Sequence, residues 1–307
     1  MTTNKSDAFH LPSGAAKTVI VTGGAGGIGA QTIRAYASHG CNVVIADLPH
    51  AQDAANSLIS SLSDPKRALY RPTNIVNWED MKSLFRETKA KFGQVDTVIA
   101  NAGLMESKGF FDFEEDERGE LKEEGEAGRI VDVNLKGSMN TLRLAMHSMA
   151  SNALDADGAR GSIVLIASTS GYFGGTGVVS YISSKHGVVG LARASQRVAN
   201  QHSVRVNVVA PFFTPTHITG GYSEQWKARG LPANTVEDVA AAIVATSTDP
   251  ARKGHSMMVA GSLIKEIETA RTTLTKEWLG EEIADVMAKG GKFFEDMGGY
   301  TLPKARS

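Results

Sequence analysis

The sequence contains a single cysteine, Cys41, among its 307 residues. One cysteine cannot form an intrachain disulfide and fits a reducing compartment, so we expect a cytoplasmic protein. Cys41 comes just before an apolar run, which predicts a buried thiol. The chain also lacks any run of 18 apolar residues, so we expect no membrane span. Its first 17 residues are polar and mixed, and we expect no secretory signal there.

Excess charge is absent as well. The net charge is −1, with 42% hydrophobic and 21% charged residues, which is typical of a globular protein. This balance offers no electrostatic footprint for nucleic acid or for an anionic membrane, so we expect neither as a partner. We also expect no resident metal ion. One acidic stretch, residues 106–128, stands out, and we interpret it as a solvated loop and helix face.

Short apolar runs alternate with helical segments along most of the chain. The strands are predicted at 18–22, 42–46, 68–73, 95–100, 162–167, 204–209 and 255–259. This alternation predicts an α/β fold, a single Rossmann-type doubly wound domain with about seven parallel strands and helices on both faces. We therefore expect a flexible lead-in at 1–16, a catalytic domain at 17–261 and a helical tail at 262–307.

A glycine-rich turn follows the first predicted strand. Gly23-Gly24-Ala25-Gly26-Gly27-Ile28-Gly29 separates that strand from a segment of helical composition. Glycines let the backbone approach a pyrophosphate closely, and the N-terminus of the helix offers N–H groups and a positive dipole end. The turn therefore predicts a dinucleotide site.

Two further strand ends carry candidate nucleotide contacts. Asp47 ends the second strand, 18 residues beyond Gly29, where a carboxylate accepts hydrogen bonds from an adenosine ribose and repels a 2′-phosphate. With no basic residue at Ala25 or Gly26, this predicts NAD(H) rather than NADP(H); the alternative is that Asp47 caps the next helix. Asn74 and Ile75 end the third strand, where they could contact adenine or form a turn.

A tyrosine and a lysine lie four residues apart in Tyr181-Ile182-Ser183-Ser184-Lys185. On a helix this spacing puts Tyr181 and Lys185 on one face. A neighbouring ammonium lowers the pKa of a phenol from about 10, which would make Tyr181 a general base or acid. Taken alone, the pair carries little weight, because tyrosine and lysine occur four residues apart by chance on many helices.

These features together resemble the classical short-chain dehydrogenase/reductase family over residues 17–261. The carrying motifs are Thr22-Gly23 with Gly27 and Gly29, Asn101-Ala102-Gly103, Asn134 within Val133-Asn134-Leu135-Lys136-Gly137, Ser168 placed 13 residues before Tyr181, Lys185, Arg205-Val206-Asn207 and Pro211. The serine spacing is that of the classical members. The Pro211–Thr216 sequence and the tail look like fungal members related to 15-hydroxyprostaglandin dehydrogenases.

The resemblance departs from the family pattern in places. Asn74 stands where an aspartate is usual, Ala100 replaces the first asparagine of the Asn-Asn-Ala-Gly motif, and Phe212 replaces the usual glycine after Pro211. The acidic stretch lengthens the gap between Asn101 and Asn134. From these differences we expect altered adenine contacts and altered packing near the substrate.

The resemblance implies roles for individual residues. The implied catalytic residues are Asn134, Ser168, Tyr181 and Lys185. The implied NAD-binding residues are Gly23, Gly27, Ile28, Gly29, Asp47, Asn74, Ile75, Asn101, Ala102, Gly103, Tyr181, Lys185, Pro211, Thr214 and Thr216. The implied substrate-binding residues are Ser168, Tyr181, Phe212, Phe213 and His217.

The expected activity is an NAD(H)-dependent interconversion of a secondary alcohol and a ketone on an apolar small molecule, with Tyr181 as acid or base. An epimerase or isomerase that oxidises its substrate transiently stays open, as does a non-catalytic dinucleotide-binding regulator. The family resemblance implies a homodimer or homotetramer.

Overall fold

The computed structural model describes residues 16–304, so the predicted flexible lead-in at 1–16 lies almost entirely outside the described residues. The chain divides into two compact units, one ending at Lys265 and the other beginning at Glu266. Each is described by itself below. Among the described residues, no helix combines the length and apolar character that crossing a membrane requires.

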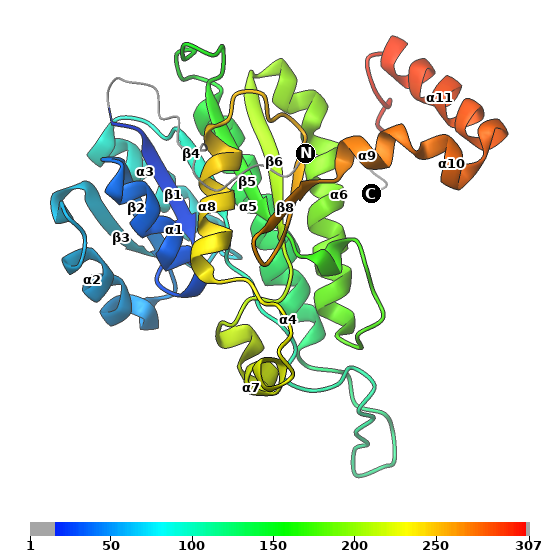
Figure 1. Cartoon of the computed structure of the whole chain (residues 1–307), viewed down its shortest axis with the longest axis horizontal. Coiled ribbons are helices and arrows are strands. Elements are labelled where there is room, and N and C mark those ends of the chain that lie inside the picture. The colour runs from blue at the N-terminus through cyan, green and yellow to red at the C-terminus, as the bar shows by residue number, and fades with distance from the viewer. Residues whose placement is uncertain (1–15, 305–307) are drawn as a thin grey trace. The chain divides into compact units, whose positions relative to one another are not determined.

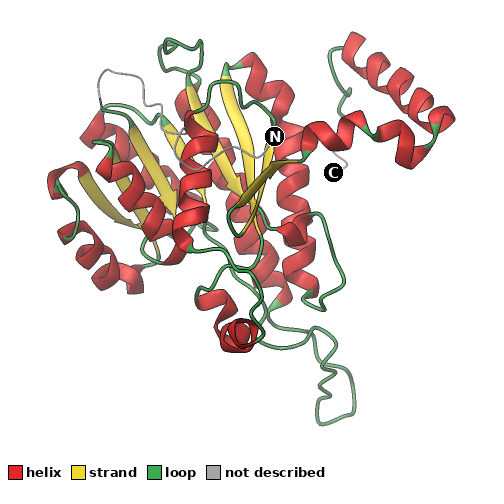
Figure 2. Ribbon diagram, viewed as in Figure 1, coloured by secondary structure: helices red, strands yellow, loops and turns green. Residues whose placement is uncertain are grey.

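The first unit is built on one eight-stranded sheet (Figures 1 and 2). The strands are β1 Thr18–Thr22, β2 Asn42–Asp47, β3 Ala68–Pro72, β4 Thr97–Ala100, β5 Gly161–Ile166, β6 Val204–Pro211, β7 Ser256–Ala260 and β8 Leu263–Glu266. Their order is β3-β2-β1-β4-β5-β6-β7-β8, and every neighbouring pair from β3 to β7 is parallel. This confirms the predicted α/β Rossmann-type fold. The order reverses between β1 and β4, so ligands are expected at the carboxyl ends of these strands.

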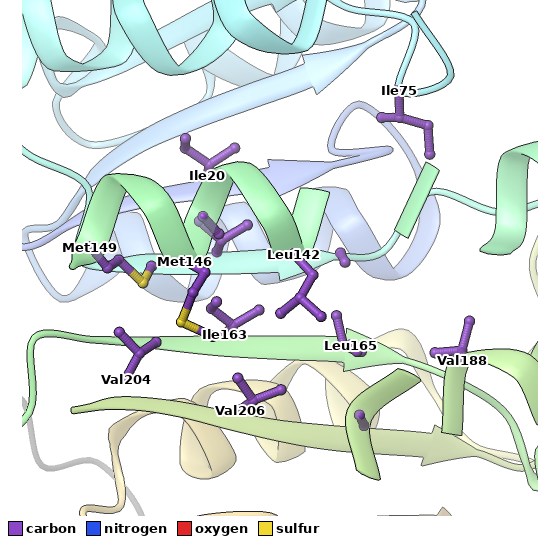
Figure 3. Packing of buried hydrophobic residues seen from close by; sticks show 14 of the residues in the cluster. Ile20, Ile75, Leu142, Met146, Met149, Ile163, Leu165, Val188, Val204 and Val206 are labelled. Carbon is purple, nitrogen blue, oxygen red and sulfur yellow. The ribbon is translucent and has the colours of Figure 1, made fainter. Parts of the chain in front are cut away.

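Helices cover both faces of the sheet. They are α1 Gly27–Ser38, α2 Gln52–Ser60, α3 Trp78–Phe92, α4 Ala127–Val131, α5 Gly137–Met149, α6 Val179–Gln201, α7 Gly220–Ala228 and α8 Val236–Thr248. Side chains alternate along each strand, so β1 sends Ile20 to one face and Val19 and Val21 to the other. Figure 3 shows the first face, where Ile20 and Ile163 pack with Leu142 and Met146 of α5.

The eighth strand was not predicted. Only Gly261 and Ser262 separate β7 from β8, and a two-residue connection can join strands only as an antiparallel hairpin. Gly261 has a φ of +60°, a conformation that glycine adopts without strain. The sheet is therefore mixed, with one antiparallel edge strand added to the seven expected.

Two predicted segments differ in detail. The helix expected over 130–150 is α4 and α5 joined by a π-helical turn, η3 Asp132–Lys136, so Asn134 lies in a widened turn. The acidic stretch forms no helix before Ala127; it runs as an extended loop (Figure 1) with one antiparallel bridge between Glu115 and Leu121. Its carboxylates repel one another, which favours this solvated conformation.

The second unit consists mainly of helices. It contains α9 Glu268–Thr273, α10 Thr275–Leu279 and α11 Glu281–Asp296. Along α11 the apolar residues Ile283, Val286, Met287 and Phe293 are exposed and recur at helical spacing. Ala284 is buried in this unit.

Candidate active site

The glycine turn has the shape that a dinucleotide phosphate needs. Gly23 has a φ of +63°, and a Cβ there would lie 2.9 Å from Ala102 Cα. A Cβ on Gly29 would lie 2.1 Å from the Gly23 carbonyl oxygen, so only glycine lets α1 begin this close to β1. The N-cap residue Gly26 has no side chain, and a Cβ on it would meet nothing within 4 Å. The space beside Gly26, at the N-terminus of α1, is therefore open, which fits a pyrophosphate.

The Asn101 side chain holds the glycine turn through hydrogen bonds. Its amide donates to the carbonyls of Thr22 (3.0 Å) and Gly23 (3.1 Å). The Thr22 hydroxyl accepts the N–H groups of Asn101 and Ala102 at 3.0 and 3.2 Å. Both amide hydrogens of Asn101 are thus used within the protein, so Asn101 would act on a nucleotide only through the glycine turn that it holds.

Asp47 lies at the carboxyl end of β2, beside the same turn. Its carboxylate accepts the N–H of Ala25 at 3.0 Å and the N–H of Leu48 at 2.8 Å. The following 3₁₀ turn, η1 Pro49–Ala51, has Leu48 as its N-cap and no side-chain cap. Asp47 is therefore oriented by the glycine turn, and two carboxylate oxygens keep lone pairs for a ribose.

Asn74 and Ile75 take mostly structural roles. The Asn74 side-chain oxygen accepts the N–H of Val76 at 3.1 Å. This bond forms the local turn that the sequence offered as the alternative to an adenine contact. Ile75 is buried in the core, as Figure 3 shows, and a Cβ on Gly137 of α5 would lie only 2.4 Å from its Cδ1. The Asn74 amide nitrogen is the group left for an adenine edge.

The Ser168 hydroxyl lies near the Tyr181 phenol and lowers its pKa. Ser168 follows β5 and also caps the 3₁₀ turn η4 Thr169–Gly171, accepting the N–H of Ser170 at 3.1 Å. Gly171 permits the close packing of η4 on α6, because a Cβ there would lie 2.7 Å from the Lys185 carbonyl oxygen. The Ser168 hydroxyl also lies 3.4 Å from the Pro211 carbonyl, which ties β6 to the site.

Lys185 lies one turn beyond Tyr181 on α6. Its Nζ is 5.6 Å from the centre of the Tyr181 ring and donates to the Ile166 carbonyl at 2.9 Å. The side chain is buried, and burial lowers the pKa of Lys185 to about 8.

The pKa of Tyr181 is raised in the structure, opposite to the direction that the Tyr–Lys spacing suggests. Burial is the largest cause of the raised pKa, the nearby Ser168 hydroxyl opposes it, and the Tyr222 and Glu106 side chains raise the pKa further. The reason is that desolvation penalises the phenolate, while Lys185 directs its ammonium at a carbonyl.

Asn134 is fully buried in the π-helical turn. Its side-chain oxygen accepts the Leu104 N–H at 2.7 Å, and its amide donates to the Leu104 carbonyl at 2.8 Å and to the Ser184 hydroxyl at 2.9 Å. A Cβ on Gly103 would lie 3.2 Å from the Asn134 side-chain oxygen and 3.5 Å from the Lys185 Nζ. Gly103 thus lies beside both the Asn134 side-chain oxygen and the Lys185 ammonium.

The residues of the segment after β6 differ in their contacts and in their exposure. Thr216 lies over the glycine turn, 3.5 Å from the position of a Cβ on Gly27, whereas the Thr214 hydroxyl is held by the Asn234 amide at 3.0 Å. Phe213 is buried and stacks on Trp226 at 4.3 Å between ring centres, while Phe212 is 39% exposed. His217 is exposed in the 3₁₀ turn η5 His217–Thr219.

Glu106 belongs to the site and was not predicted. One of its oxygens, Oε1, accepts the N–H groups of Ser180 and Tyr181 at 2.5 and 3.0 Å. In the sequence it opens the acidic stretch, 75 residues before Tyr181, and nothing local distinguishes it from the other acidic residues there. Only the folded chain brings it to the start of α6.

Comparisons with known proteins show what the chain is similar to. A family model described as short chain dehydrogenase matches residues 17–227. The chain is 35% identical to short-chain dehydrogenase reductase 4 of Arabidopsis thaliana over 210 residues, covering 68% of this chain and 65% of that protein. It is 29% identical to short-chain dehydrogenase/reductase prx4 of Penicillium roqueforti over 292 residues, covering 89% and 83% of the two chains.

Solved structures show the same relationship. The 3-hydroxyacyl-CoA dehydrogenase type-2 of Mycobacterium avium superposes with a TM-score of 0.69 at 28% identity, over 81% of this chain and 96% of that one. Enzymes of this kind use a nicotinamide dinucleotide, and the glycine turn described above fits one. The chain belongs to the short-chain dehydrogenase/reductase family.

Proposed function

We propose that the protein is an NAD(H)-dependent oxidoreductase that interconverts a secondary alcohol and a ketone on an apolar small molecule. The observation that carries the proposal is the placement of Tyr181 and Lys185 on one face of α6, with the Lys185 Nζ 5.6 Å from the centre of the phenol ring, and of Ser168 beside the phenol, whose pKa it lowers. These groups lie at the carboxyl end of the sheet, where the glycine turn also lies.

NAD(H) is favoured as the cofactor by the groups around the glycine turn. Asp47 is aimed there by its bonds to Ala25 and Leu48, and a carboxylate at this point accepts ribose hydroxyls and repels a 2′-phosphate. Gly23, Gly27, Ile28 and Gly29 would hold the pyrophosphate, and Thr216 would close over it. When bound, NAD⁺ supplies the hydride acceptor at nicotinamide C4 and a positive charge near the site.

The protein would then orient the alcohol and move one proton. The Ser168 hydroxyl donates to the substrate oxygen and aligns it with the phenol. Tyr181 accepts the hydroxyl proton at its phenol oxygen as the carbonyl forms, and returns it in the reverse direction. Because burial raises the pKa of Tyr181, the base form needs positive charge nearby, and the Lys185 ammonium is a cation within reach.

Asn134 would support the site through the loop that it fixes. Its amide holds both backbone groups of Leu104 and joins them to Ser184, which lies between Tyr181 and Lys185 on α6. Its side-chain oxygen keeps one lone pair on the Lys185 side of Gly103, where a water could be held for proton exchange.

An apolar substrate is favoured by the aromatic residues after β6. Phe212 and Phe213 pack with Tyr222 and Trp226 of α7, with ring centres 4.3 to 5.6 Å apart. Phe213 supports the cluster from within, and the partly exposed Phe212 offers its ring to a ligand. Apolar and aromatic lining is usual for pockets that bind small molecules.

A screen of secondary alcohols and ketones, followed by NADH absorbance, tests the proposal. We expect NADH to form in equal amount to the ketone produced. Product without NADH would indicate an epimerase or isomerase. NADH binding with no turnover of any compound would indicate a non-catalytic regulator.

We also infer a homodimer or homotetramer in the cytoplasm. The family resemblance supports an oligomer, and the single, buried Cys41 fits a reducing compartment. Light scattering after size-exclusion chromatography tests the assembly, and a monomer at micromolar concentration would contradict it.

A further inference from the structure

The N-terminus of α6 is held by a carboxylate from another part of the chain. The helix is 23 residues long, and its N-cap residue, Val178, provides no side-chain cap. Glu106, in the loop after β4, provides one instead: its Oε1 accepts the N–H of Ser180 at 2.5 Å and that of Tyr181 at 3.0 Å. Its other oxygen, Oε2, is buried and has no hydrogen-bond partner among the described residues.

We propose that Glu106 is a positioning residue that fixes the first turn of α6 and, with it, the direction of the Tyr181 phenol. The proposal rests on the proposed function, in which Tyr181 is the proton acceptor. A helix leaves its first N–H groups without internal partners, so the first turn frays unless an acceptor holds it. Here that turn carries the phenol itself, and Glu106 bonds to the backbone of the same residue.

The charge of Glu106 has a second effect on Tyr181. The charged or titratable groups facing the phenol are Glu106 from the loop after β4, Tyr222 from α7 and Lys185 from α6 itself. Glu106 raises the pKa of Tyr181, because a nearby carboxylate disfavours a second negative charge. An uncharged residue of the same shape should therefore let Tyr181 ionise at lower pH.

Two substitutions separate these effects. In Glu106→Gln the side-chain carbonyl can still accept both N–H groups, so the first turn holds and only the charge is lost. We expect the acid limb of the kcat/KM profile for alcohol oxidation to move to lower pH, because the phenolate forms earlier. In Glu106→Ala the acceptor is lost, and we expect kcat to fall by about tenfold or more while the KM for NAD⁺ is unchanged.

A titration without substrate gives an independent readout. The tyrosinate absorbance of the wild type minus that of Tyr181→Phe isolates Tyr181 from the other tyrosines. The same difference taken in the Glu106→Gln background should show ionisation at lower pH. This measurement needs no turnover, so it tests the effect of the Glu106 charge on Tyr181 even where no alcohol is oxidised. A failure to oxidise any alcohol would count against the proposed function alone.

Glu124 provides a matched control. Its Oε2 accepts the N–H groups of Glu126 and Ala127 at the start of α4, and its Oε1 is also buried without a partner among the described residues. Glu124→Gln removes the same charge from the same kind of cap, and Tyr181 should ionise as in the wild type. Full kcat in Glu106→Ala would overturn the positioning role of Glu106, and an unshifted Tyr181 titration in Glu106→Gln would overturn its charge effect.

Discussion

The ammonium of Lys185 donates a 2.9 Å hydrogen bond to the main-chain carbonyl of Ile166, the last residue of β5. This contact anchors α6 to the strand that delivers Ser168, and it directs the charge of Lys185 toward the sheet. Burial lowers the pKa of Lys185 to about 8, because the protonated form loses hydration. The buried, protonated Lys185 therefore lowers the stability of the folded protein.

The first prediction concerns the pH dependence of stability. The unfolded chain binds a proton at Lys185 up to about pH 10.5, whereas the folded chain releases it near pH 8. Stability rises with pH wherever the unfolded state binds more protons. Relative to Lys185→Met, the wild type should therefore gain about 3 kcal/mol in free energy of unfolding between pH 7 and pH 10.5. Urea titrations of both proteins measure this difference, and a constant difference across the range would contradict it.

The second prediction concerns Asn134. Asn134→Ala leaves both backbone groups of Leu104 and the Ser184 hydroxyl without their partner. We expect a loss of about 2 to 3 kcal/mol in free energy of unfolding. We also expect kcat to fall at least about tenfold, because the loop beside Lys185 loosens.

A buried asparagine elsewhere separates stability from catalysis in that experiment. The Asn152 amide donates to the carbonyls of Val95 and Arg160 at 2.8 and 2.9 Å, at the opposite end of the sheet. Asn152→Ala should lower stability by a similar amount and keep the wild-type kcat at a temperature where both proteins are folded. Equal losses of kcat in the two variants would mean that Asn134 acts only through stability.

The third prediction concerns cofactor choice. Asp47→Asn removes the charge that repels a 2′-phosphate and weakens the bonds to a ribose. We expect NADH to bind about tenfold more weakly and NADPH more tightly, as measured by titrating cofactor fluorescence. Asp53→Asn, which removes an exposed charge from the first turn of α2, should leave both affinities unchanged. Equal affinities of the wild type for NADH and NADPH would refute the role given to Asp47.

Much of the fold could be predicted from the sequence because local signals were strong. The β-branched run Thr18–Thr22 is a buried strand with the predicted bounds, and the tight turn after it has room only for glycine at Gly23 and Gly29. The run Leu263–Glu266 was missed because it is short and alternates between exposed and half-buried residues. Its pairing depends on the turn at Gly261, whose positive φ no local pattern reveals.

The proximity of the candidate site residues could be predicted from the sequence, but their contacts and the direction of their pKa shifts could not. Spacing brought Ser168, Tyr181 and Lys185 together, yet it implied that Lys185 lowers the pKa of Tyr181. The raised pKa follows from burial, which depends on the whole fold. Glu106 could not be found for the same reason, since a contact across 75 residues leaves no local pattern.

The most direct test of the proposed chemistry is the turnover of Tyr181→Phe with a secondary alcohol that the wild type oxidises. Phenylalanine keeps the ring and removes the phenol oxygen that accepts the proton. We predict that the variant binds NADH with wild-type affinity and loses NADH formation by a factor of about 10² to 10⁴. NADH formation by Tyr181→Phe at a rate close to that of the wild type would contradict the assignment of Tyr181 as the acid–base residue.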